Sequence, residues 1–201
     1  MRKQSIEFFL DELSSSKLVP GGGSAASLVA AIGIALGSMV GHLALSKKRY
    51  QSIIPEIESV IAKSEQLKRD LEYLIEKDVI ACELLLKAFK MSKSDREVVM
   101  DAALEEACTV PLEIMKKTIE AINLHEQLLK LGITTAISDI GVGVSFCKSA
   151  LEGASLSVFI NTKLMKNDGM KATLNEETEW LLQTGMEKAN AIFHEVATTL
   201  K

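Results

Sequence analysis

The chain has 201 residues, of which 47% are hydrophobic and 25% charged, the balance of a globular protein with one domain over residues 1–201. Its net charge of −4 argues against non-specific nucleic-acid binding, which needs a basic face to neutralise phosphates. Cys82, Cys108 and Cys147 form no CxxC pair, which predicts reduced thiols in a cytoplasmic protein and no zinc ribbon. The start, MRKQSIEFFLDEL, mixes acids with apolar residues and so lacks the apolar core of a signal peptide.

The first predicted element is a short amphipathic helix and its closing turn, in the stretch FFLDELSSSKLVP. Gly21, Gly22 and Gly23 follow it. A P-loop is excluded because no lysine comes after these glycines, and a dinucleotide-binding turn is excluded because no strand precedes them. Two interpretations of the glycines stay open: a tight turn, or amides at a helix start that bind an anion or a partly negative group.

The second element is the stretch Ser24–Ser46, which contains no Asp, Glu, Lys or Arg. Its length suits a membrane span, but its many Ala, Gly and Ser residues would make insertion weak. Gly33, Gly37 and Gly41 lie four apart on one helix face, where another helix can approach closely. This favours the central helix of a bundle, with Ser24 as its N-cap, over a membrane span.

Four further helices are predicted from apolar residues spaced three and four apart, over about residues 57–91, 94–131, 138–166 and 173–200. Pro55 suits the first turn of one helix, and capping boxes at Ser94 and Thr173 begin two others. Pro111 predicts a new helix start or a kink, and Gly132 a C-cap.

No stretch alternates with period two long enough to predict a strand. We therefore expect an all-α fold, a bundle of long helices around a central helix of small residues. So much apolar helix implies exposed apolar surface, which makes a homodimer the expected assembly.

Polar residues within apolar faces are the candidate functional groups. Asp78 interrupts an apolar stripe, and a buried carboxylate is costly unless it is paired or functional. Asn161 interrupts another stripe, where it makes either a helix–helix hydrogen bond or a ligand contact. Asp139 stabilises a helix N-terminus or has a further role. His125 and His194 are expected on polar faces, and no metal-ligand spacing occurs.

Several motifs occur along the chain: Pro20-Gly21-Gly22-Gly23-Ser24, Met39-Val40, Lys47-Lys48-x-Tyr50, Asp78 in its helix, Ala88-Phe89-Lys90, Val110-Pro111-Leu112, Ser138-Asp139-x-Gly141 and Gly153 through Asn161. Together they resemble the formiminotransferase-cyclodeaminase C-terminal domain family, which includes stand-alone methenyltetrahydrofolate cyclohydrolases. The resemblance covers about residues 5–166 and implies an all-helical fold that dimerises, a folate substrate, and no cofactor besides it.

The resemblance also suggests roles for single residues. Asp78 is the first candidate for the catalytic base and Asp139 the second, and His42 is a candidate hydrogen-bonding group, acid or base. The glycine amides would hold the oxygen that forms on the carbon bridging two nitrogens of the folate. Lys47 and Lys48 would bind the glutamate tail of the folate. The expected substrate-binding residues are Gly21, Gly22, Gly23, Ser24, Lys47, Lys48, Ser138 and Asn161.

Two activities fit this resemblance. A cyclohydrolase adds water to 5,10-methenyltetrahydrofolate, and a cyclodeaminase releases ammonia from 5-formiminotetrahydrofolate. Because no formiminotransferase domain is present, we favour the cyclohydrolase. The chain departs from the family pattern at His42, where Asn is usual, and at Gly132-Ile133, where Gly-Asn is usual. These departures support a third interpretation, a non-catalytic protein that binds a folate or a protein partner.

Overall fold

The fold is known from a computed structural model, which describes residues 4–201. The described residues form helices and no strand, which confirms the all-α prediction. The elements are α1 (Ile6–Ser14), α2 (Gly22–Leu45), the 3₁₀ helix η1 (Lys48–Ile53), α3 (Ile54–Phe89), α4 (Lys93–Lys130), α5 (Ile137–Thr162) and α6 (Asp168–Thr199).

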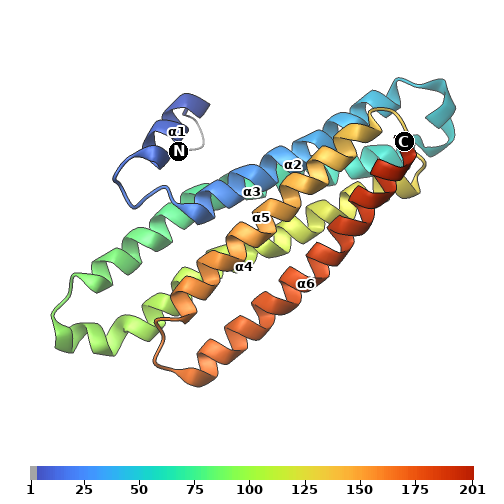
Figure 1. Cartoon of the computed structure of the whole chain (residues 1–201). Helices are drawn as coiled ribbons and strands as arrows, with labels where there is room; N and C mark the ends of the chain where they lie inside the picture. The colour runs from blue at the N-terminus through green and yellow to red at the C-terminus, as the bar shows by residue number, and fades with distance from the viewer. Residues whose placement is uncertain (1–3) are drawn as a thin grey trace.

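Five long helices build the bundle (Figure 1). Helices α2, α3, α4 and α5 each pack against the next, and α5 also packs against α2, so that the four close a ring. Helix α6 covers the groove between α4 and α5. Helix α1 packs against none of the other described elements, and Figure 1 shows it apart from the bundle, near the start of α2.

Helix α2 is one of the four helices of the ring, where α4 contacts more α-helices than it does, and the glycines of α2 admit three different neighbours. A Cβ on Gly33 would lie 2.8 Å from the carbonyl oxygen of Gly143 in α5, so two backbones touch there. Gly37 faces the ring of His125 in α4, and Gly41 faces Ile61 in α3. Backbone-to-backbone packing therefore occurs at Gly33, while the other two glycines make room for side chains.

His125 is fully buried, so its predicted place on a polar face was wrong. The ring faces Gly37 and Gly143, which leave space that any side chain would fill. Its Nε2 lies 3.1 Å from the carbonyl oxygen of Gly33, and its Nδ1 has no hydrogen-bond partner among the described residues. Burial lowers the pKa of His125 to about 4, so the ring is neutral at physiological pH.

Of the described helices, α2 alone is long and apolar enough to pass a length-and-composition test for a membrane span. Half of its most apolar window is buried within the bundle, as expected for the core helix of a packed domain. The glycines of α2 contact three other helices, and this close packing explains why the helix is rich in small apolar residues.

The helix ends differ from several predictions. The N-cap of α2 is Gly21, because Ser24 lies inside the helix and bonds to α3. The N-cap of α4 is Ser92, two residues before the predicted one, and the helix continues through Pro111. The N-cap of α6 is Asn167 in place of Thr173. The predicted first-turn Pro55 of α3 is confirmed, as is the left-handed Gly132 after α4 (φ 69°).

Candidate functional site

A small pocket lies where α2 begins, between α2, α3, α4 and the last turns of α5. Its volume is about 190 Å³. It brings together the three predicted glycines, the first candidate base and the predicted asparagine. The lining residues are Leu18, Gly21, Gly22, Gly23, Asp78, Ala81, Cys82, Leu85, Ala107, Pro111, Ser157, Ile160 and Asn161.

Asp78 is the one charged residue in this pocket. It reaches from the middle of α3 to the start of α2, where the hydroxyl of Ser24 donates to its Oδ2 at 2.7 Å. Burial raises the pKa of the Asp78 carboxyl, although the hydrogen bonds from Ser24 act in the opposite direction. A carboxylate with a raised pKa accepts a proton more readily than one in water, which suits a general base.

Gly23 is required by the position of this carboxylate. A Cβ at Gly23 would overlap the Asp78 side chain and would lie 2.7 Å from its Cγ. The carboxylate therefore rests against the backbone of the first turn of α2, where helix amides and the helix dipole favour negative charge. Gly22 differs, because a Cβ there would meet only the Ser157 hydroxyl, at 3.8 Å.

Asn161 closes the pocket from α5. Its amide nitrogen donates to the carbonyl oxygen of Ala107 at 3.3 Å, so the expected helix–helix hydrogen bond exists and the residue also lines the pocket. Two further polar lining residues were not predicted, Cys82 and Ser157. Helical spacing could have found them, because each lies four residues from a predicted one and so shares its face.

Cys82 is half-buried next to the carboxylate. Burial and the negative charges of Asp78 and Glu83 raise the pKa of its thiol. The thiol is therefore protonated at neutral pH, which makes it a poor nucleophile. Among the described residues, no cluster of three His, Cys, Asp or Glu side chains is arranged to bind a metal ion.

The remaining predicted residues lie at the opposite end of the bundle. Lys47 and Lys48 follow the last turn of α2, and Ser138 and Asp139 occupy the first turn of α5. The length of α2, 24 residues, separates this end from the pocket by about 35 Å at 1.5 Å per residue. One copy of the chain therefore does not place these residues beside Asp78.

His42 belongs to the same far end. It lies in the last turn of α2 and is exposed, so it is neither a core residue nor part of the pocket. Nearby, Arg49 donates to the Thr135 hydroxyl at 2.8 Å, and the Tyr50 hydroxyl accepts from the Thr134 amide at 2.9 Å. These bonds hold the segment after α2 against the loop that precedes α5.

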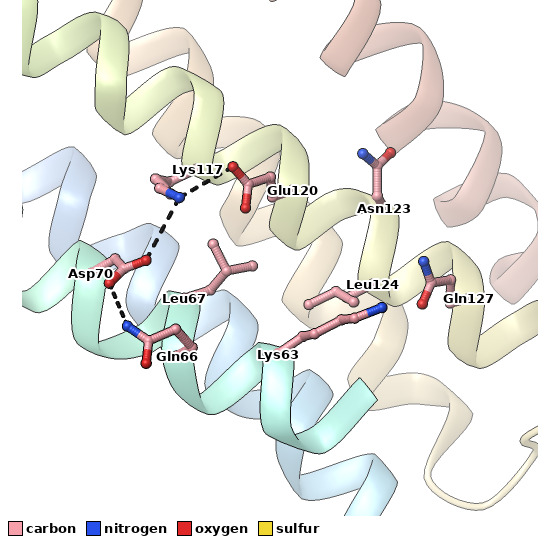
Figure 2. Close-up of a pocket in the computed structure, with 9 residues that line it drawn as sticks. All are labelled: Lys63, Gln66, Leu67, Asp70, Lys117, Glu120, Asn123, Leu124 and Gln127. Atoms are coloured by element: carbon pink, nitrogen blue, oxygen red, sulfur yellow. Dashed lines mark hydrogen bonds and ion pairs between the residues drawn. The ribbon is translucent and has the colours of Figure 1, made fainter. Parts of the chain in front are cut away.

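A second, wider groove runs between α3 and α4 (Figure 2). Three of its charged residues pair with one another: Lys117 lies 3.6 Å from Asp70 and 3.3 Å from Glu120, and Gln66 donates to Asp70 at 2.7 Å. Lys63, Asn123 and Gln127 complete its polar rim. None of the predicted site residues lines this groove, and we assign it no chemistry.

Comparison with known proteins gives one family over most of the chain. The family profile described as formiminotransferase-cyclodeaminase matches residues 5–180. A methenyltetrahydrofolate cyclohydrolase from Methylorubrum extorquens is 34% identical, over 98% of this chain and 96% of its own length. The formimidoyltransferase-cyclodeaminase of Mus musculus is 27% identical over 92% of this chain, which spans 35% of that longer protein.

A solved structure agrees with this match. The crystal structure of formiminotetrahydrofolate cyclodeaminase from Thermotoga maritima superposes with a TM-score of 0.84 and is 26% identical in sequence. The superposition covers 97% of this chain and 98% of that one.

Proposed function

Because the chain belongs to the formiminotransferase-cyclodeaminase family, we propose that it is a methenyltetrahydrofolate cyclohydrolase, a folate enzyme of one-carbon metabolism. The similarity to a cyclohydrolase over nearly the full length of both proteins supports this activity. The single observation that carries the proposal is a partly buried carboxylate, Asp78, held by Ser24 against the first turn of α2.

The proposed reaction adds water to the bridge carbon of 5,10-methenyltetrahydrofolate. This bridge is a cation shared by two nitrogens, so the negative charge of Asp78 favours its binding. Asp78 takes a proton from the attacking water while the oxygen bonds to the bridge carbon. The bond between that carbon and N5 then breaks and N5 takes up a proton, which leaves 10-formyltetrahydrofolate and releases one proton overall.

The glycines before α2 supply a second element of the mechanism. The free amides at the start of a helix are donors, and the helix dipole is positive there. In the proposal, amides of Gly21, Gly22 and Gly23 stabilise the oxygen that forms on the bridge carbon. The amide side chain of Asn161, which lines the same pocket, contacts the pterin part of the substrate.

The alternative activity is a cyclodeaminase, which closes the formimino group onto N10 and releases ammonia. The cyclodeaminase of known structure favours it, because its chain matches this one in length as well as in fold. In this reaction too, the carboxylate of Asp78 would be the group that transfers the proton. The departures at His42 and Ile133 lie at the far end of the bundle and favour a non-catalytic folate-binding relative.

The first experiment follows the near-ultraviolet absorbance of 5,10-methenyltetrahydrofolate with purified protein, against a blank without protein. We expect faster loss than in the blank, and a decrease of about 10²–10⁴-fold in kcat for Asp78→Asn. Asp70→Asn, on the same helix but outside the pocket, is the matched control and should keep full activity. Full activity in Asp78→Asn would contradict the assignment of the base.

If the absorbance falls no faster than in the blank, ammonia release from 5-formiminotetrahydrofolate is measured next. Turnover there assigns the cyclodeaminase, while saturable folate binding without turnover assigns the non-catalytic relative. We further propose that the protein acts in the cytoplasm as a homodimer and uses no cofactor besides the folate.

A further inference from the structure

The pocket around Asp78 is too small for a whole folate. Its volume of about 190 Å³ lies below the roughly 300–1,000 Å³ of sites for molecules of drug size. No Lys or Arg lines it, although a folate tail carries carboxylates, which bind best to such cations. A benzoyl ring and an amide bond, together about 10 Å long, separate these carboxylates from the reacting bridge. The tail of a bound folate therefore has to leave this pocket.

A neighbouring pocket, the end pocket, continues the first one toward the end of the bundle that holds the α3–α4 and α5–α6 turns (Figure 1). Its volume is about 220 Å³. Helix α3 gives Leu85 to the first pocket and Phe89 to the end pocket, and α5 with the turn after it gives Ile160 and Leu164 in the same way. Residues four apart share a helix face and lie about 6 Å apart along the axis. Together the two pockets reach the lower part of the size range of sites for drug-sized molecules.

The end pocket supplies the cations that the first pocket lacks. Lys93, Arg96 and Lys166 line it. Arg96 donates one N–H to the carbonyl oxygen of Phe89 at 3.3 Å, which holds the guanidinium over the end of α3. Neither Arg96 nor Lys93 forms an ion pair with a carboxylate of the described residues, whereas Lys166 lies 3.5 Å from Glu97. The remaining N–H groups of Arg96 and the ammonium of Lys93 are therefore available to an acidic ligand.

The two acidic residues of the end pocket already have partners. Asp101 accepts hydrogen bonds from the backbone amides of Lys166 and Asn167, at 2.9 and 3.0 Å, and so fastens the α5–α6 turn to α4. Glu97 pairs with the Lys166 side chain. These acids hold the wall of the pocket together, and Lys93 and Arg96 remain as its uncompensated positive charges.

The apolar wall of the end pocket suits an aromatic ring. Phe89 and Leu164 are 39% and 49% exposed, and Met100 lies half-buried beside them in the pocket lining. Aromatic rings pack favourably on one another in offset or edge-to-face arrangements. A benzoyl ring that leaves the first pocket would cover these side chains before its carboxylates reach the cations.

We infer that the end pocket is the tail subsite of the folate, in which the benzoyl ring packs on Phe89 and Leu164 and the glutamate carboxylates pair with Arg96 and Lys93. The inference rests on the proposed function for the identity of the ligand. Eleven residues of α3 separate Asp78 from Phe89, a span of about 16 Å. An extended folate covers this span when its glutamate side chain and the hydrogen bonds at both ends are included.

Kinetics of charge-neutral variants test the subsite. The double variant Lys93→Gln/Arg96→Gln should raise the KM for 5,10-methenyltetrahydrofolate at least tenfold and leave kcat within twofold, because neither side chain touches the reacting bridge. Arg96→Lys keeps the charge and should raise KM less than Arg96→Gln. The control Lys63→Gln/Lys130→Gln removes two positive charges from the same two helices outside the end pocket and should leave KM unchanged.

A substrate without tail charge separates binding from structural damage. In the diamide of 5,10-methenyltetrahydrofolate, both tail carboxylates are replaced by neutral amides. The wild type should show at least a tenfold higher KM for the diamide, and Lys93→Gln/Arg96→Gln should have the same KM for it as the wild type. The subsite is overturned if the double variant raises the KM for both substrates equally, or for neither. It is also overturned if Lys47→Gln/Lys48→Gln raises the KM for the natural tail and the end-pocket variant does not.

Equilibrium binding keeps the two proposals apart. If the protein turns over neither folate, calorimetry with the stable analogue 5-formyltetrahydrofolate and with its diamide replaces the kinetics. At least tenfold tighter binding of the charged analogue, lost in Lys93→Gln/Arg96→Gln, means that the proposed activity fails and the tail subsite stands. Equal affinity for the two analogues, or no saturable binding of either, overturns the subsite. Turnover without any effect of the tail leaves the proposed function in place and removes the inference alone.

Discussion

Replacing Asp78 by Asn should stabilise the fold while it removes the proposed catalytic base. Burial raises the pKa of this carboxyl above its unfolded value, so the folded state holds the proton more tightly. The contribution of Asp78 to stability is therefore greatest below about pH 4 and falls as the pH rises through the folded pKa. Near neutral pH the ionised group destabilises the fold.

The size of the effect follows from the local contacts. One pKa unit corresponds to about 1.4 kcal/mol, and the oxygen of an Asn side chain can still accept the hydrogen bond from Ser24. We therefore expect Asp78→Asn to raise both the free energy of unfolding and the Tm at pH 8, because the ionised carboxyl that burial disfavours is replaced by a neutral amide. The difference should disappear as the pH approaches 4.

Urea unfolding of the wild type and of Asp78→Asn at several pH values between 4 and 8 measures this difference. Asp70→Asn serves as the control, because that carboxylate lies at the surface 3.6 Å from Lys117. Its loss should cost about 0–1 kcal/mol without any gain at high pH. A variant at Asp78 that is less stable than the wild type at pH 8, or a difference that does not change with pH, would refute the reasoning.

Three further predictions concern Gly23, His125 and Cys82. Gly23→Ala should lower activity at least tenfold and cost about 1–3 kcal/mol in urea unfolding, because its Cβ overlaps Asp78, whereas Gly22→Ala has open space and should be tolerated. His125 has a folded pKa of about 4, below the unfolded value near 6.5, so it should reduce stability by about 3 kcal/mol as the pH falls from 6.5 to 4. His125→Gln should lose that dependence in urea titrations, and a wild type equally stable at both pH values would contradict the burial argument. Cys82 should react slowly with iodoacetamide at pH 8 and faster in Asp78→Asn, since the carboxylate raises the pKa of the thiol; equal rates by mass spectrometry would disprove the coupling.

The sequence was sufficient to predict the long helices, because four of them leave apolar residues spaced three and four apart and α2 lies within a stretch that contains no charged residue. The caps were harder to predict, since Ser92 and Ser94 are equally good cap residues and only the backbone decides between them. Ser24 has the composition of a cap, yet its hydroxyl bonds to a residue 54 positions away in another helix.

The candidate site was predictable where polar residues interrupt apolar stripes, as Asp78 and Asn161 do. The same reasoning failed for His125, because its space is made by glycines of two other helices, and spacing within α4 does not reveal them. Lys47 and Lys48 have the right chemistry for a folate tail, but their distance from the pocket depends on the whole length of α2.

The packing of His125 among glycines also limits how the sequence of this protein can change. A methyl group on Gly143 would lie 2.8 Å from the Nε2 of His125 and equally close to the Gly33 carbonyl, while one on Gly37 would lie 3.0 Å from the ring. A smaller residue at 125 would relieve the contacts at Gly37 but only part of those at Gly143. An alanine at 37 is therefore harmful beside His125 and tolerable after the histidine is lost, which makes the order of the two substitutions decisive. Positions 37 and 125 should consequently vary together among functional descendants of this chain, whereas glycine at 143 should persist in either background.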